Sequence, residues 1–310
     1  MTGAEPPRPS RTVTPGSAES LAQVGTAEEL FFPLSSLELH DVVRAALVED
    51  GAFDDITTVA TVVSDRRGRA TLASREPGVV AGVPFVLEAF RQLDPKVSIR
   101  VDAPDGSPVQ PGTIVLFAAG HSRALLSAER VALNFLQYLS GIATLTRRYV
   151  EQVEGTSARI LDTRKTLPGW RRLAKYAVRA GGGLNHRLDL ATGVLIKDNH
   201  LIAVDSDVRL AVERARAMAP PGTPIEVECD RPDQVVAALD AGADLVLLDN
   251  MQPDMLRACV ELARGRALTE ASGGVKLETV REIAETGVDR ISVGALTHSA
   301  PALDLGLDFD

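Results

Sequence analysis

Positively charged side chains gather in one stretch of this acidic chain, between residues 160 and 200. The 310-residue chain has a formal net charge of −9, yet this stretch holds eight lysines and arginines against three aspartates. A cleft lined by one sign of charge concentrates ligands of the opposite sign. The stretch therefore predicts a site for an anionic small molecule. A nucleic-acid partner is not expected, because that would favour a domain that is basic overall.

Charged residues follow two apolar runs within this stretch. The run 159–162 has the pattern of a short buried strand, and Arg164 and Lys165 come just after it. The run 190–196 is typical of a second strand, which ends at Lys197. Ligands of parallel α/β proteins bind beyond the carboxyl ends of the strands. These cations are therefore expected to line one binding site.

Polar groups or glycines also end the later apolar runs of the chain. They are Glu228, Asp249, the loop Ser272-Gly273-Gly274, and Gly294. Any one of them could equally be a solvated strand end, but a packed sheet does not require one at every strand. Carboxylate oxygens suit Mg²⁺ or ribose hydroxyls, although Asp249 could instead cap the next helix. The two late loops suit a phosphate, which accepts hydrogen bonds from backbone N–H groups.

Alternating strands and helices must position these residues. Six short apolar strands are predicted, at 159–162, 190–197, 224–229, 244–250, 268–272 and 290–295. Helices are predicted between them, at 171–179, 207–218, 232–241, 253–263 and 277–286. Short strands joined by helices predict a parallel sheet of the α/β class, and this many repeats favours closure into a barrel. A seventh or eighth strand is not evident.

A different pattern precedes the barrel. Residues 1–27 are rich in Pro, Ser, Thr, Gly and Ala and predict a disordered tail. Residues 28–134 mix predicted helices and strands in the manner of an α+β sandwich domain. A long helix at 127–151, with Ser127 as its N-cap, leads into the barrel domain at 135–298. Residues 299–310 are expected to pack back on the first domain.

The composition is that of a globular enzyme, with 45% hydrophobic and 24% charged residues. The two cysteines, Cys229 and Cys259, have no nearby Cys or His partner and are interpreted as small buried residues. So few cysteines favour a reducing compartment over a disulfide framework. No apolar run is long enough to span a bilayer, and no signal-peptide pattern follows Met1. A cytoplasmic protein without a membrane partner is expected.

Three motifs of the basic stretch occur together in one known family. The segments are DTRKTLPGWR at 162–171, GGGLNHRLDL at 181–190 and IKDNH at 196–200. Together they closely resemble quinolinate phosphoribosyltransferase, and the resemblance covers nearly the whole chain after the first few dozen residues. It implies an N-terminal α+β open sandwich followed by an incomplete, seven-stranded-type α/β barrel, the fold of type II phosphoribosyltransferases.

The resemblance also implies a reaction and an assembly. The family converts quinolinate and phosphoribosyl pyrophosphate to nicotinic acid mononucleotide, pyrophosphate and carbon dioxide, a step of de novo NAD biosynthesis, with Mg²⁺. It forms homodimers, and a trimer of dimers stays open. In the segment LSAERVALN at 126–134, Arg130 matches an arginine that reaches across the dimer into the partner's barrel.

Roles for the remaining residues are implied by their positions in the matching motifs. Residues that match contacts to quinolinate or phosphate are Arg164, Lys165, His186, Arg187 and Lys197. Glu228 and Asp249 match an acidic pair around the ribose and Mg²⁺, with the metal held mostly through the substrate pyrophosphate. Residues that match the phosphate loops are Ser272, Gly273, Gly274, Gly294 and His298. Those expected to be catalytic are Lys165, Lys197, Glu228 and Asp249.

Two other functions stay open. A paralogous phosphoribosyltransferase for another aromatic acid, such as the molybdenum-locus relative, would lack part of the arginine set, whereas Arg130, Arg164 and Arg187 are all present. A non-catalytic anion-binding protein that kept the barrel would have lost the lysines or the acidic pair at the strand ends, and all of these are present. The first comparison favours the dicarboxylate substrate, and the second favours a catalytic protein.

Overall fold

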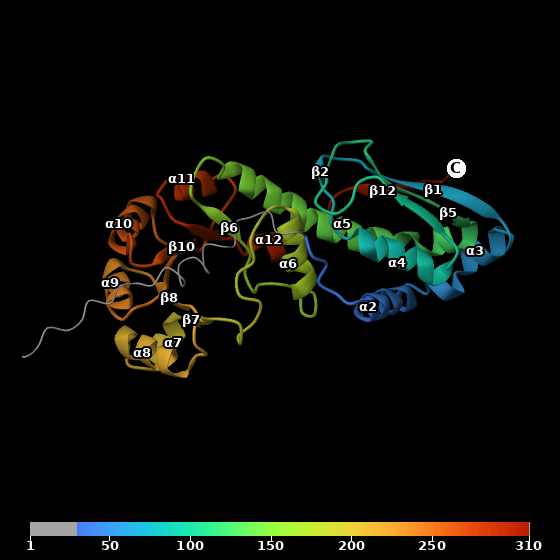
Figure 1. The fold of residues 1–310 in the computed structure, drawn as a ribbon. Coiled ribbons are helices and arrows are strands. Elements are labelled where there is room, and N and C mark those ends of the chain that lie inside the picture. The colour runs from blue at the N-terminus through green and yellow to red at the C-terminus, as the bar shows by residue number, and fades with distance from the viewer. Residues whose placement is uncertain (1–29, 310) are drawn as a thin grey trace, which may run out of the picture.

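Two domains joined by one long helix make up the chain in this computed structural model, which describes residues 30–309 (Figure 1). The tail predicted for residues 1–27 lies outside the described residues. Helix α5 (Ser122–Gln152), green in Figure 1, belongs to the N-terminal domain at its start and contacts the C-terminal domain further along. Its buried side chains recur at helical spacing and include Leu125, Leu136 and Ile142, all fully buried. No described helix is long and apolar enough to cross a membrane.

The N-terminal domain packs helices on an antiparallel sheet of strand order β12-β1-β5-β3. The strands are β1 (Arg67–Ser74), β3 (Ser98–Val101), β5 (Ile114–His121) and β12 (Leu305–Phe309). The helices besides α5 are α2 (Ser36–Glu49), the 3-10 turn η1 (Ala52–Asp54), α3 (Ile56–Thr61) and α4 (Val83–Leu93). A small ribbon of β2 (Gly78–Val79) and β4 (Pro108–Val109) completes the domain. Phe85 and Phe90 of α4 are fully buried in its core.

The C-terminal residues return to the N-terminal domain, where β12 pairs antiparallel with β1 (Figure 1). The chain crosses α5 on its way to this strand. At the crossing, Gln137 Nε2 donates to Leu305 O at 2.7 Å and Leu303 N donates to Gln137 O at 3.0 Å. Gly141 lies directly beneath the backbone of Pro301. The absence of a Cβ at Gly141 is what permits this close approach.

Gly141→Ala is expected to destabilise the protein by about 1–3 kcal/mol through overpacking. A Cβ there would lie 3.0 Å from Pro301 C and Ala302 Cα, both of them backbone atoms that cannot swing aside. Urea unfolding measures the effect. Asn134→Ala, on the exposed side of the same helix, is the control and should not destabilise, because alanine has the higher helix propensity. A higher unfolding midpoint for Gly141→Ala would contradict the close approach.

The C-terminal domain is built on six parallel strands in the order β6-β11-β10-β9-β8-β7. They are β6 (Arg159–Leu161), β7 (Val194–Ile196), β8 (Ile225–Cys229), β9 (Leu245–Asp249), β10 (Leu268–Ser272) and β11 (Arg290–Ser292). The helices between them are α6 (Arg171–Ala180), α7 (Asp198–Ile202), α8 (Val208–Met218), α9 (Pro232–Asp240), α10 (Pro253–Ala263), α11 (Val280–Ala284) and α12 (Ala295–His298). The predicted parallel α/β sheet of six strands is thereby confirmed.

Closure of this sheet into a barrel, expected from the number of repeats, is wrong for the described residues. β6 and β7 are the two edges of an open sheet. Beside β6 there is one isolated parallel bridge, Leu161 to Leu184. The chain then forms a turn in which Asp189 Oδ1 accepts from Ala191 N at 2.9 Å and Thr192 N at 3.0 Å.

Three predicted element boundaries are also corrected. The strand predicted at 190–197 is shorter, because the Asp189 turn delays its start to Val194. The helix predicted at 277–286 begins only at Val280, after a turn in which Lys276 N donates to Thr279 Oγ1 at 3.2 Å. Ser127 is not an N-cap, since α5 starts directly after β5 and Ser127 Oγ instead donates to Asp55 Oδ2 at 2.9 Å.

Candidate active site

The carboxyl ends of the parallel strands bring most of the predicted residues to one edge of the sheet. The paired register places Glu228 opposite Leu247, two residues before the end of β9, and Asp249 opposite Ser272. Arg164 and Lys165 follow β6, and Gly294 lies two residues past the end of β11. The sequence therefore predicted the location of this edge from strand ends alone.

The two acidic residues of this edge each have a close partner. Lys197 Nζ, just past β7, forms an ion pair with Glu228 Oε2 on β8. The Glu228 side chain is 13% exposed, whereas that of Lys197 is 44% exposed. Asp249 Oδ2 accepts a hydrogen bond from Asn250 Nδ2 at 2.7 Å. The sequence predicted that Lys197 and Glu228 belong to one site, and the structure shows that they contact each other directly.

Lys165, Gly294 and His298 lie together at the β6 and β11 ends. A Cβ on Gly294 would be 3.1 Å from Lys165 Cδ and 3.2 Å from His298 Nε2, so both side chains pass close over this glycine. Thr297 Oγ1 donates to Lys165 O at 2.7 Å and so fixes α12 to the loop after β6. A lysine, a histidine and the start of a short helix around a glycine are groups that suit a phosphate.

Two arginines of the site, Arg164 and Arg187, are close enough to affect each other. Burial, and then the positive charge of Arg164, lower the pKa of Arg187. Arg187 Nη1 donates to Gly193 O at 2.9 Å. Arg164 Nε is buried, with no hydrogen-bond partner among residues 30–309. Two neighbouring guanidinium groups with such an unsatisfied donor favour a bound anion.

Arg130 is not brought to this edge within the described chain. It lies exposed on the part of α5 that contacts the N-terminal domain. One turn earlier, Ser127 bonds to Asp55, which precedes α3. The prediction that Arg130 serves a partner's site agrees with its exposure and stays a prediction.

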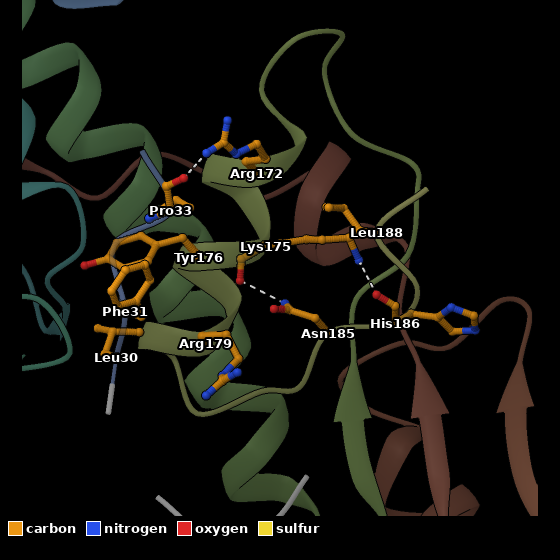
Figure 2. A pocket seen from close by; sticks show the side chains of 10 residues that line it. All are labelled: Leu30, Phe31, Pro33, Arg172, Lys175, Tyr176, Arg179, Asn185, His186 and Leu188. Carbon is orange, nitrogen blue, oxygen red and sulfur yellow. Dashed lines mark hydrogen bonds between the residues drawn. The ribbon is translucent and has the colours of Figure 1, made fainter. Parts of the chain in front are cut away.

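Behind the edge lies a buried ion pair that the sequence analysis did not single out. Lys175 Nζ of α6 contacts Asp162 Oδ1, and the side chains are 4% and 0% exposed. Asp162 also accepts from Asn185 Nδ2 at 2.6 Å and from His186 N at 2.9 Å. Figure 2 shows the bond from Lys175 Nζ to His186 O, at 2.8 Å. The pair therefore fixes the backbone of the segment that carries Arg187. A buried charge directly after an apolar strand was the available signal.

A cavity of about 330 Å³ lies on the α6 side of this pair, between α6 and Leu30, Phe31 and Pro33 (Figure 2). Of the predicted site residues, its lining includes only His186. The His186 ring points away from α6, toward the strands (Figure 2). The cavity thus flanks the site and does not contain the acidic pair or the glycine loops.

Two interior glutamates face the His186 ring. His186 Nε2 lies 3.2 Å from Glu226 Oε2 and 3.5 Å from Glu270 Oε1. Burial acts to lower the pKa of His186, but the two carboxylates outweigh it and raise that pKa. Glu226 and Glu228 are two residues apart on β8 and so share one face of the strand, and the sequence could not tell which of them lies against His186.

Within the described part of the chain, His186, Glu226 and Glu270 also form the one group of three metal-ligating side chains with close ligand atoms. Their hydrogen bonding does not suit a metal. Arg187 N donates to His186 Nδ1 at 2.7 Å, so the proton of the neutral ring is on Nε2, which faces the carboxylates. A metal-bound histidine instead donates from its second nitrogen to an acceptor.

Stability is expected to fall with rising pH because of Glu270. Burial, and then the charge of Glu226, raise the pKa of Glu270 from 4.5 to about 7. A group whose folded pKa is raised stabilises the fold at low pH and loses that contribution as pH rises through the folded value. The loss between pH ~4.5 and ~7 should be roughly 3 kcal/mol. Glu270→Gln should remove this component in urea unfolding, and the exposed control Glu278→Gln should keep it. If the free energy of unfolding changed equally with pH in the wild type and in both variants, the raised pKa of Glu270 would be contradicted.

Known proteins are similar to this chain along most of its length. The model of the quinolinate phosphoribosyl transferase N-terminal domain matches residues 55–140, and that of the C-terminal domain matches residues 142–308. The carboxylating nicotinate-nucleotide pyrophosphorylase of Mycobacterium leprae is 47% identical over 277 residues, which are 87% of this chain and 96% of that protein. The probable enzyme of the same name from Bacillus subtilis is 40% identical over 275 residues, 89% of this chain and 94% of that protein.

Solved structures give the same result. The nicotinate-nucleotide pyrophosphorylase from Francisella tularensis superposes with a TM-score of 0.84 at 37% identity, over 90% of this chain and 99% of that one. NadC from Streptococcus pyogenes superposes with a TM-score of 0.85 at 39% identity, over 89% and 99%. Both domains are matched in sequence, and about nine tenths of the chain is matched in structure. The chain belongs to the quinolinate phosphoribosyltransferase family.

Proposed function

We propose that this chain transfers the phosphoribosyl group of phosphoribosyl pyrophosphate to quinolinate and releases nicotinic acid mononucleotide, pyrophosphate and carbon dioxide. The enzyme would thus act in de novo NAD biosynthesis. Family membership supports the reaction class, and the site supports the substrates. Nothing in the site favours the paralogous reading or a non-catalytic anion-binding protein.

The observation that carries the proposal is a pair of neighbouring arginines, one of which has a buried donor with no partner in the described chain. Arg164 and Arg187 lie near each other, and the buried Nε of Arg164 has no partner in the described chain. Arginine binds carboxylates through two parallel hydrogen bonds. Quinolinate carries two adjacent carboxylates, so two arginines would hold both and direct its ring nitrogen toward the ribose. A monocarboxylate would leave one guanidinium without its anion.

Groups for the phosphoribosyl donor lie on neighbouring strand ends. The loop Ser272–Gly274 and the Gly294 loop with Lys165 and His298 suit its phosphates. Asp249 and Glu228 lie on adjacent strands, and we expect them to accept hydrogen bonds from the ribose hydroxyls. The ion pair with Lys197 would orient the Glu228 carboxylate. The developing positive charge on the ribose would be stabilised by these two carboxylates.

Mg²⁺ fits this corner of the site in its donor chemistry. Asp249 and Glu228 supply carboxylate oxygens, the ligands that Mg²⁺ prefers. Glu228 already contacts Lys197, so Asp249 is the more available ligand, and most of the cation's contacts would come from the substrate pyrophosphate. When bound, the cation would neutralise the leaving pyrophosphate. We propose Mg²⁺ as the cofactor on these grounds.

We further propose a homodimer with shared sites, in which Arg130 of one subunit completes the site of the other. Arg130→Ala and Lys197→Ala should each be inactive alone. Mixed and allowed to exchange subunits, they should recover about a quarter of wild-type activity, because half of the dimers are mixed and each mixed dimer has one intact site. Mixing either variant with itself is the control. No recovery, with exchange verified by mass-tagged subunits, would contradict the shared site.

The direct test of the reaction uses the purified chain with Mg²⁺, phosphoribosyl pyrophosphate and quinolinate labelled in the 2-carboxylate. Labelled carbon dioxide and nicotinic acid mononucleotide should appear in equal amounts, and neither should form without phosphoribosyl pyrophosphate. Release of neither product by the folded protein would contradict the proposal.

A further inference from the structure

Asn250 has an unusual backbone at the centre of the candidate site. Its φ is 55°, in the left-handed region, and only two other non-glycine residues of the described chain, Asp205 and Ser206, have positive φ. Asparagine tolerates this region better than most residues, but glycine would adopt it with less strain. Asn250 directly follows Asp249 at the end of β9. The contacts of its side chain, which glycine would lack, are therefore the question.

Asn250 contacts both neighbouring parts of the site, one through its side-chain amide and the other through its backbone N–H. Its Nδ2 donates to Asp249 Oδ2 at 2.7 Å, and its backbone N donates to Ser272 O at 2.8 Å. The carboxylate can only accept, so Nδ2 is the atom that faces it. One residue thus links the carboxylate at the end of β9 to the loop at the end of β10.

The same amide lies flat against Gly273. A Cβ on Gly273 would be 2.5 Å from Asn250 Cγ and 2.8 Å from Asn250 Nδ2, which is closer than side chains approach. Gly273 has φ 90° and Gly274 has φ 59°, so the loop is built for glycine in its backbone as well. The amide therefore also fixes where the glycine loop lies relative to Asp249.

We infer that Asn250 is a positioning residue for the phosphoribosyl donor, because its amide holds the Asp249 carboxylate and the Ser272–Gly274 loop in one fixed geometry. The inference rests on the proposed function, which assigns the ribose to Asp249 and a phosphate to this loop. Donor binding needs both groups at once, at a separation set by the substrate. Quinolinate, bound by arginines from β6 and the 185–188 segment, should be indifferent to Asn250.

The test is a calorimetric titration of the full chain with phosphoribosyl pyrophosphate and Mg²⁺. Asn250→Gly keeps the backbone conformation and removes the amide. It should weaken donor binding about tenfold or more, since a hydrogen bond to a charged group is lost. Asn250→Asp should weaken it at least as much, because it sets a second carboxylate against Asp249. In turnover, the KM for the donor should rise while the KM for quinolinate stays within about twofold of wild type.

Two controls separate positioning from general destabilisation. Ser206→Gly relieves the same kind of backbone strain in the turn between α7 and α8 and should leave donor affinity unchanged. Gly273→Ala should also weaken donor binding. The double variant with Asn250→Gly should lose less affinity than the sum of the two single losses, because the amide that clashes with the new Cβ is gone.

Wild-type donor affinity in a folded Asn250→Gly protein would overturn the inference, as would equal rises in both KM values. Failure of the wild-type protein to bind the donor would instead overturn the proposed function itself, and the inference with it. The two failures are thus distinguished by the wild-type titration.

Discussion

Lys175→Met is expected to lower the free energy of unfolding by about 3–5 kcal/mol and to reduce turnover sharply, because it leaves the charge of Asp162 buried and unpaired. Asp162 is 0% exposed and accepts from Lys175, Asn185 and the backbone of His186. Burial raises the pKa of Asp162 and lowers that of Lys175, so desolvation opposes the pair even in the native protein. The ion pair contributes by fixing the backbone of the segment that carries His186 and Arg187.

Urea unfolding and steady-state kinetics measure the two effects of Lys175→Met. The matched control is Arg209→Ala, which breaks the exposed ion pair with Glu213 at 2.9 Å and should cost less than about 1 kcal/mol. Asp162→Asn combined with Lys175→Met should cost less than the sum of the single changes, because no buried charge remains without a partner. A small cost for Lys175→Met, similar to that of the control, would contradict the buried-pair account.

Arg164→Ala is expected to lower kcat/KM for quinolinate by about 30- to 5,000-fold, which corresponds to the loss of roughly 2–5 kcal/mol on truncating a buried charged partner. Its guanidinium lies beside Arg187, and its Nε is buried without a partner among the described residues. Arg164→Lys should recover only part of the loss, because lysine cannot make two parallel hydrogen bonds to a carboxylate.

Arg171→Ala is the control for loss of one positive charge in the same region. Arg171 Nε donates to Thr166 Oγ1 at 3.3 Å, and Arg171 is not among the predicted substrate contacts. Arg171 Nη2 also donates to Arg164 O at 3.5 Å, so its loss removes long hydrogen bonds to the 164–166 loop but no predicted substrate contact. Because such bonds contribute about 1 kcal/mol, kcat/KM should change by less than about tenfold. An unchanged affinity for quinolinate in Arg164→Ala would contradict the assignment of Arg164 to the carboxylates.

The sequence predicted the edge of the sheet where the site forms because strand ends are visible in apolar patterning. Arg164, Lys197 and Asp249 were found this way, each as a charge after an apolar run. Apolar patterning does not show which residue each of these charged side chains contacts. The ion pair between Lys197 and Glu228 and the hydrogen bond from Asn250 to Asp249 depend on sheet order, which a single sequence does not reveal.

The errors have local physical causes. Ser127 is a good N-cap residue, but helix α5 continues directly from β5, so tertiary connection outweighed the capping signal. Closure of the barrel was expected from the number of repeats, whereas β6 and β7 remain the two edges of an open sheet in the described chain. Alternation along β8 placed Glu226 and Glu228 on one face but did not show that Glu226 lies one layer deeper, against His186.

The most direct test of the central claim compares quinolinate with nicotinate as substrates for the purified protein, with phosphoribosyl pyrophosphate and Mg²⁺ in both reactions. If two arginines each require a carboxylate, quinolinate should yield nicotinic acid mononucleotide with release of carbon dioxide, and nicotinate should yield little or none. Equal rates with the two acids would show that the second carboxylate is not recognised and would contradict the account.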